Sequence, residues 1–290
     1  MKRILIVALS ATIASSAFGV NLYSNQSSNV NVAALNFSTT TRSGVTAGSG
    51  TMWSEVQANG AGVQLESNTT AGFGMLTGVA GPPATGNRLA DDFTVGGLGW
   101  NVTGLAVFAY STGATANPFT GGTLNIWSGR PGDANSTIVT TGTWFNSTDQ
   151  LQLDANTVGV GNRIFNTNSP APGSAPGTTR RIWQNNFTLA VTLNPGTYWM
   201  DFSLTAASGF APSTTHQDVR GVVGANGRQR TNSTGVWADM IDTGNPATAA
   251  DVAQEVPFIV SGTEVVPEPM TMGVLALGAA ALAARKRRKS

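Results

Sequence analysis

The stretch FTLAVTLNPGTYWMDFSLTA, residues 187–206, decides the fold class of this sequence. Apolar residues alternate with polar or small ones before Asn194-Pro195-Gly196 and again after it. A period of two is the pattern of a β-strand with one buried face, and a turn between two such runs is typical of a hairpin. The stretch therefore predicts two antiparallel strands that pair with each other.

The same pattern recurs along the chain. Residues 99–111 predict a long strand, and Gly104, where the alternation changes phase, predicts a β-bulge within it. Residues 123–128 and 137–144 predict two further strands joined by a turn at residues 129–133. Shorter strands are expected at residues 30–37, 52–58, 89–95, 181–185, 219–223, 235–241 and 257–265.

The composition agrees with many short strands joined by turns. Only 11% of the residues are charged and 35 are glycine, and no amphipathic helical pattern separates the strands. Parallel βαβ architecture needs such crossover helices, so it is excluded. We expect an all-β fold, an antiparallel β-sandwich that is jelly-roll-like, over residues 20–263. The Pro/Gly/Ser-rich residues 167–178 are interpreted as a long loop within one sandwich; a boundary between two domains is the alternative.

Positive charge is concentrated at the two ends of the chain. Setting aside seven basic residues there leaves nine of the 16, all arginine, against 15 acidic residues. This acidic, lysine-free body argues against nucleic-acid binding, which needs clustered cations. The chain has no cysteine, which excludes disulfides, thiol chemistry and cysteine-based metal sites.

The first 19 residues, MKRILIVALSATIASSAFG, have the three parts of a secretory signal peptide. Lys2 and Arg3 form the charged region, an apolar run follows, and small residues precede the expected cleavage after Ala17 or Gly19. The sequence thus predicts export through the Sec translocon. A buried N-terminal helix is the alternative.

The last 25 residues, VPEPMTMGVLALGAAALAARKRRKS, form a tail of three parts within residues 264–290. Pro267 and Pro269 flank Glu268 and keep that segment extended. Residues 270–284 predict a short transmembrane helix of roughly 22 Å, which is less than the bilayer core of about 30 Å. The tail therefore predicts a transient anchor in the inner membrane, with a basic cluster on the cytoplasmic side. That cluster is Arg285, Lys286, Arg287, Arg288 and Lys289.

The order of these parts resembles the PEP-CTERM sorting signal of Gram-negative, often biofilm-forming bacteria. The resemblance covers about residues 265–290, with Pro267-Glu268-Pro269 as its motif. It implies recognition by an exosortase, a membrane-embedded cysteine transpeptidase-like enzyme, and removal of the tail. It also implies a final location in the cell envelope, at the cell surface or in the extracellular matrix. An ordinary permanent C-terminal membrane anchor is the alternative.

Few residues of the body offer catalytic chemistry. A Ser-His-Asp triad would need His216, which stands in a polar segment without a nucleophile motif, so a surface role is favoured. Asp91 and Asp92 open a predicted strand and are expected to be exposed and paired with arginine; a glycosidase would instead need two such carboxyl groups across a cleft. Asp133 is interpreted as a turn residue, with a calcium ligand as the alternative.

Two tryptophans give the one indication of a binding surface. Trp127 and Trp199 each fall on the polar phase of their strand, and exposed indoles can stack on sugar rings. The interpretation we prefer is that a loop, a sheet or a second layer covers this face.

These features predict an exported, non-enzymatic protein with a structural or adhesive role, and with no cofactor and no metal. Two rival hypotheses remain open. One is a carbohydrate-binding module for extracellular polysaccharide that uses Trp127 or Trp199. The other is a secreted glycan hydrolase or lyase that uses paired carboxylates.

Overall fold

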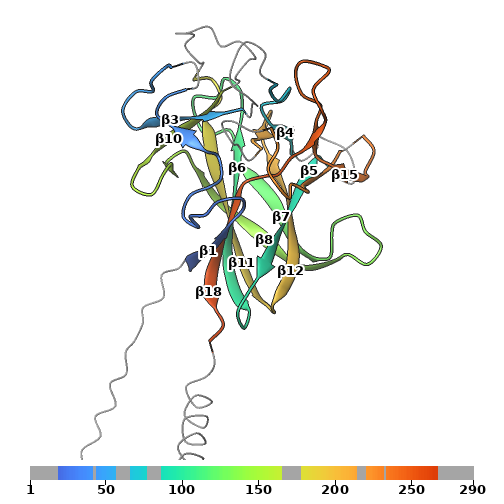
Figure 1. Ribbon diagram of the computed structural model, residues 1–290. Helices are drawn as coiled ribbons and strands as arrows, with labels where there is room; N and C mark the ends of the chain where they lie inside the picture. Colours follow the sequence, from blue (N-terminus) through green and yellow to red (C-terminus); the bar gives the residue numbers. More distant parts are fainter. Residues whose placement is uncertain are drawn as a thin grey trace, which may run out of the picture.

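The structure is a computed structural model in which all regular secondary structure of the described residues is β-strand (Figure 1). This confirms the predicted all-β class. The predicted signal peptide, apart from Gly19, and the sorting tail beyond Val266 lie outside the described residues. The structure describes residues 19–41, 44–56, 66–76, 86–164, 178–213, 220–231 and 233–266.

The strands of these ranges form one large sheet and two small ones. The large sheet contains β1 (Val20–Ser24), β4 (Phe73–Gly74), β5 (Arg88–Val95), β6 (Trp100–Tyr110), β7 (Gly121–Ser128), β8 (Thr137–Thr148), β11 (Ile182–Leu193), β12 (Gly196–Thr205), β13 (Phe210–Ala211), β14 (Arg228–Arg230), β15 (Trp237–Asp239) and β18 (Phe258–Glu264). The second sheet contains β2 (Phe37–Ser38), β3 (Thr51–Glu55), β9 (Leu151–Gln152) and β10 (Val158–Ile164), and the third pairs β16 (Ile241–Asp242) with β17 (Val252–Ala253).

The large sheet is antiparallel and curls around one core. Its strands follow the order β1-β18-β6-β11-β8-β7-β12-β5-β14-β15. The curl brings β5 against the far edge, because Phe93 lies 6.2 Å from Tyr23 of β1 and 6.1 Å from Phe258 of β18, measured between ring centroids. The large sheet confirms that the fold is mainly antiparallel, while the sandwich and its jelly-roll connectivity stay predictions.

One hydrophobic core fills the inside of this curl. Phe93, Leu124, Phe187 and Phe202, which alternate with polar residues along their strands, all point into it. The interruption at residues 167–178 falls between β10 and β11, yet strands on both sides of it contribute to this core. The strands before and after this interruption thus share one core, while the domain boundaries stay a prediction.

The second sheet covers part of the outer face of the large sheet. From Leu105 to Tyr110, every residue of β6 is buried, on both faces of the strand. Its outward residues Ala106, Phe108 and Tyr110 pack with Leu35 and Met52 in a second hydrophobic cluster. In this second sheet, β10 runs parallel to β3, which departs from a purely antiparallel fold.

The predicted hairpin at residues 187–206 is wrong in its pairing. The two strands and the turn between them exist, but β11 pairs with β6 and β8, whereas β12 pairs with β5 and β7. The turn therefore arches from one half of the curled sheet to the other. β11 still buries one face, as its alternation predicts, whereas β12 is buried on both faces from Trp199 to Leu204.

A second arch, between β5 and β6, packs against the first. Gly99 has a φ of 111°, a region that L side chains rarely adopt. A Cβ at Gly99 would lie 2.5 Å from the carbonyl oxygen of Leu193 at the first arch. The two arches thus need a glycine at the point where they meet.

Two local predictions are confirmed and two are wrong. The register of β6 against β18 is irregular between Val102 and Gly104, as a bulge requires, and β7 pairs with β8 across the turn that follows Ser128. The expected strand at residues 30–37 is instead a chain of turns that ends in β2, and residues 220–223 form bends and a turn. In the first segment Ala33 and Leu35 are buried without pairing in a ladder, whereas Val223 in the second is 98% exposed.

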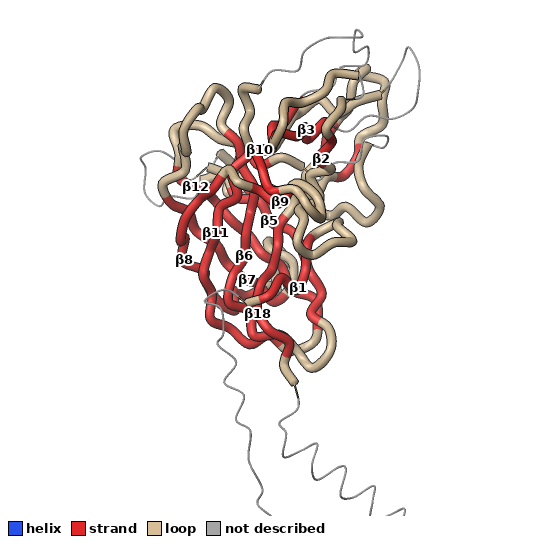
Figure 2. Tube along the Cα trace, turned by 90° about the vertical axis from the view of Figure 1, so that its left-hand side faces the viewer, coloured by secondary structure: helices blue, strands red, loops and turns tan. Residues whose placement is uncertain are grey.

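The two ends of the described body leave it side by side. β1 pairs with β18, and Val20 lies opposite Gly262. Figures 1 and 2 show β18 running to one end of the body, while β3 and the second sheet lie toward the opposite end. The chain that follows Val266 therefore starts from the end that is far from the second sheet.

Candidate functional site

The structure places Trp127 and Trp199 next to each other, but it covers the second. They are directly opposite across β7 and β12. Trp199 is only 6% exposed, with the Arg130 guanidinium carbon 5.6 Å from its ring centroid. Trp127 is half-buried. Trp199 is therefore covered, in agreement with the interpretation that a loop or second layer lies over this face, because the residues after β7 fold back over it.

The indole of Trp127 takes part in a buried polar centre around Asp201. The Asp201 carboxylate is fully buried and accepts hydrogen bonds of 2.7 Å from Trp127 Nε1 and from Asn125 Nδ2. It also forms an ion pair with Arg88. The polar phase of β12 thus marks an internal hydrogen-bond centre and not a surface for a sugar.

The turn at residues 129–136 forms part of this cover. The side chain of Arg228 donates to the carbonyl oxygens of Pro131 at 2.6 Å and Trp237 at 3.1 Å, and Arg130 pairs with Asp239. Asp133 lies in the turn, where its backbone carbonyl accepts from Ser136 and its carboxylate lies 3.5 Å from Arg228 Nη1. Among the described residues, no group of three or more His, Asp or Glu side chains is placed to hold a metal ion.

Asp91 is buried, not exposed as expected. Its carboxylate accepts hydrogen bonds from Val256 N at 2.8 Å and Asn25 Nδ2 at 3.0 Å. The same amide nitrogen lies 2.8 Å from Glu255 Oε2, so Asn25 bridges two carboxyl groups. The strand alternation places Asp91 inside the curl, where no arginine of the described residues forms an ion pair with it.

Burial controls the protonation of this pair. It raises the pKa of Asp91 well above its usual range, and the nearby Glu255 carboxyl adds to the rise. Burial also raises the pKa of Glu255, against hydrogen bonds from Asn25 that lower it. A raised pKa is a property of catalytic acids, but neither residue lines the largest described cavity. The pair is instead part of the internal polar structure.

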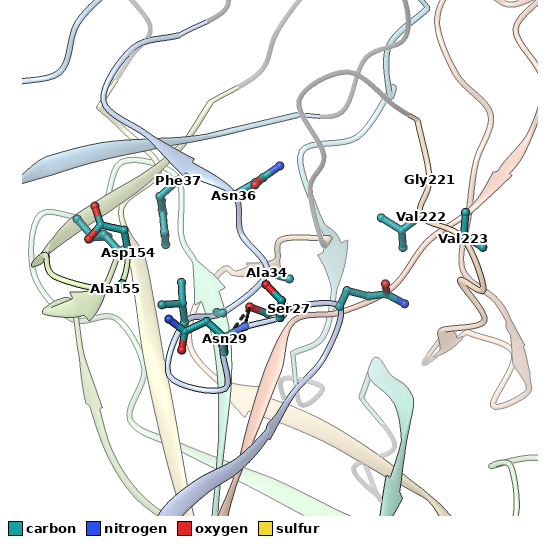
Figure 3. Close-up of a pocket in the computed structure, with 15 residues that line it drawn as sticks. Ser27, Asn29, Ala34, Asn36, Phe37, Asp154, Ala155, Gly221, Val222 and Val223 are labelled. Atoms are coloured by element: carbon teal, nitrogen blue, oxygen red, sulfur yellow. Dashed lines mark hydrogen bonds between the residues drawn. The ribbon is translucent and has the colours of Figure 1, made fainter.

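The largest described cavity lies beside the N-terminal segment that follows β1 (Figure 3). It has a volume of about 600 Å³ and three walls: residues 26–37, residues 153–155 and residues 221–223. Figure 3 shows Ser27 and Asn29 on one side, Asp154 on a second and Val222 on a third. Gln26 and Asn36, which both line it, are the two non-glycine residues of the described chain with positive φ. Strained backbone of this kind is common at binding sites.

The chemistry of this cavity suits binding better than acid–base catalysis. Its one carboxylate, Asp154, accepts hydrogen bonds of 2.8 Å from the amide nitrogens of Asn156 and Thr157. These hydrogen bonds lower the pKa of Asp154, and the bond from the Asn156 amide has the largest effect on it. A turn-forming carboxylate with a lowered pKa is a poor proton donor, and no second acid stands among the described lining residues. The remaining lining is amide, hydroxyl and apolar.

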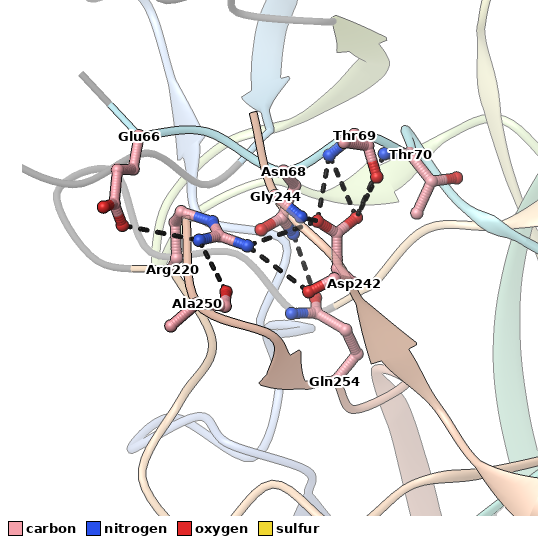
Figure 4. A network of polar contacts seen from close by, with 9 residues as sticks. All are labelled: Glu66, Asn68, Thr69, Thr70, Arg220, Asp242, Gly244, Ala250 and Gln254. Atoms are coloured by element: carbon pink, nitrogen blue, oxygen red, sulfur yellow. Dashed lines mark hydrogen bonds and ion pairs between the residues drawn. The ribbon is translucent and has the colours of Figure 1, made fainter. Parts of the chain in front are cut away.

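A buried ion pair anchors one wall of the cavity (Figure 4). Arg220 comes directly before residues 221–223, and its side chain lies 3.5 Å from carboxylates of both Asp242 and Glu66. Asp242 also accepts from the amide nitrogens of Thr69 at 2.9 Å and Gly244 at 2.9 Å. Sequence reasoning missed this network, because its members are far apart in the chain and lie in segments without periodicity.

Several predicted site residues lie outside the described residues. They are His216, the motif Pro267-Glu268-Pro269, the predicted helix at 270–284, and the cluster Arg285, Lys286, Arg287, Arg288 and Lys289. Within the described part of the chain, no helix reaches the length and apolarity needed to cross a membrane.

Comparison with known proteins identifies the tail. Residues 265–288 match the family model of the PEP-CTERM protein-sorting motif. This motif indicates a protein that is targeted to an exosortase and exported across the membrane to the cell surface. No curated protein and no solved structure matches the chain. The motif thus defines the route of the protein, and the body must be interpreted from its own residues.

Proposed function

We propose that this protein is a non-enzymatic structural or adhesive component of the cell envelope or extracellular matrix. In this proposal it crosses the inner membrane through the Sec translocon, is held briefly by residues 270–284, and is then processed by an exosortase. The observation that carries the proposal is the sorting motif at residues 265–288.

The arrangement of the body supports this role. The chain continues into the tail from the end of β18, while the 600 Å³ cavity is lined by loops near the second sheet, toward the opposite end. A body that is held by its tail would therefore direct these loops away from the membrane. That orientation suits a surface component that meets material outside the cell.

Glu268 is the residue on which the sorting proposal is tested. We expect Glu268→Ala to leave a membrane-bound precursor, because the exosortase recognises the motif beside the membrane. Fractionation of a processing-competent host, with an antibody against the body, measures the distribution. Glu264→Ala is the matched control, since Glu264 is an exposed glutamate four residues upstream, at the end of β18. Release of Glu268→Ala to the same extent as wild type would contradict the proposal.

The hydrolase hypothesis has less support from the described geometry. It would need two acids that face a shared cleft. Asp91 and Glu255 are close but buried, and Asp154 is alone in the largest cavity. The carbohydrate-binding hypothesis lacks its expected exposed Trp199, but a different face of the body offers suitable chemistry.

A further inference from the structure

A groove without charged residues crosses the outer face of the large sheet. It has a volume of about 430 Å³ and is lined by residues of β1, β18, β6, β11 and β8 together with Asn31 and Gln152. Among the residues that the structure describes, its lining contains no Asp, Glu, Lys or Arg. These five strands are neighbours in this order, and at about 4.8 Å per strand the groove spans roughly 19 Å.

Two groups of amide side chains form the walls of this groove. On one side, Asn21 Nδ2 donates to Asn31 Oδ1 at 3.1 Å. On the other, Gln184 donates to Asn186 and Asn186 donates to Asn146, both at 2.8 Å. These bonds hold the amides in place and leave further donor and acceptor positions on them, because each amide carries two N–H donors and a carbonyl oxygen.

The floor between these walls is apolar and shallow. Gly104 and Ala106 of β6 lie beside Ile259 of β18. Phe145 of β8 lines the groove and is 51% exposed. An exposed aromatic ring next to small residues offers a flat apolar surface, while the amides offer polar contacts at its edges.

We propose that this groove binds a neutral polysaccharide chain. Sugar rings without ionised groups present hydroxyls that both donate and accept, and apolar C–H faces that pack on an aromatic ring. The amide walls match the hydroxyls, Phe145 matches a ring face, and the uncharged lining offers no counter-charge to an anionic or cationic polymer. The inference rests on the proposed role at the cell surface and names a ligand class for it.

Affinity electrophoresis tests the proposal with wild-type protein released by a processing-competent host. The gels contain, one at a time, a neutral β-glucan, a galactomannan, a xyloglucan or a dextran, and separately anionic alginate or cationic chitosan. We expect retardation by at least one neutral polymer, unchanged when salt is added, since a neutral ligand forms no screened ion pairs.

Variants of the groove locate the site. We expect Phe145→Ala and Asn186→Ala each to weaken binding roughly tenfold. Ile138→Ala is the matched control, because Ile138 is a 49% exposed apolar residue of the same strand that does not line the groove. Thermal melting checks that each variant is folded, and Asn31→Ala, a change in an exposed loop residue, replaces any variant that is not.

Three results would overturn the proposal: no retardation by any neutral polymer, salt-sensitive retardation by the charged polymers only, or wild-type affinity in folded groove variants. Failure of the inference is distinguishable from failure of the sorting proposal. Protein that is processed and released but binds no neutral polymer defeats only the groove. Protein that binds but stays as a membrane precursor defeats only the sorting.

Discussion

Asp201 illustrates how one buried residue determines what its neighbours can do. It is fully buried, and it ties Arg88, Asn125 and Trp127 into one centre on the covered face of the sheet. The alternation of Asp201 with Phe202 indicated that this face of β12 is polar, but it did not indicate that the turn after β7 covers the face. A charged residue on the polar phase of a strand can equally indicate solvent or an internal ion pair.

Removing this carboxylate should be strongly destabilising. We expect Asp201→Ala to lower the free energy of unfolding by about 3–5 kcal/mol, because it leaves Arg88 largely buried without its partner. Urea denaturation measures the change. Asp251→Ala is the control, since Asp251 is exposed and should change stability by less than about 0.5 kcal/mol. Equal stabilities of the two variants would show that the centre contributes little.

The pair of Asp91 and Glu255 should make stability depend on pH. Because burial raises both pKa values above their ordinary values of about 3.9 and 4.3, the folded state keeps protons that the unfolded chain has released. The resulting stability is fully present below about pH 4 and is lost as the pH rises through the folded-state pKa values.

Glu255→Gln isolates this contribution, since the glutamine amide stays neutral at every pH. We expect its urea midpoint to fall less than that of wild type between about pH 4 and pH 7. Glu264→Gln, at an exposed glutamate, should keep the wild-type slope. A Glu255→Gln profile parallel to wild type would argue against a raised pKa in the pair.

At the scale of elements, alternation predicted strands far better than it predicted partners. β6, β7, β11 and β12 were all predicted from a period of two, yet β11 and β12 arch across the core instead of pairing. Alternation reports burial of one face, and both a hairpin and an arch satisfy that condition. The partner is decided by packing between residues that are distant in sequence, such as Gly99 against Leu193.

The pairing of β18 with β6 should depend on Gly262. A Cβ at this position would overlap the carbonyl oxygen of Asn101, which belongs to the backbone of the neighbouring strand. We expect Gly262→Ala to cost about 1–3 kcal/mol of stability through overpacking. Gly96→Ala has open space around the new methyl group and serves as the control. Thermal melting compares them, and an unchanged melting temperature for Gly262→Ala would contradict the tight approach.

At the scale of the whole molecule, the sorting tail could be predicted from the sequence, whereas the candidate sites could not. The motif at residues 265–288 is local, so its residues are contiguous and their order identifies it. The cavity and the groove are built from segments such as residues 26–37 and 221–223, which only the fold brings together. Trp199 was predicted as a site residue because its cover, the turn after β7, is not visible in its own strand.

In our proposal the signal peptide directs export, and an exosortase then recognises and removes the tail. The intact mass of the protein purified from the surface of a processing-competent host tests it most directly. We predict a mass that lacks the basic residues Arg285 to Lys289, and a larger, membrane-bound form in the same host without its exosortase. A surface protein whose mass includes the complete C-terminal sequence would contradict the account.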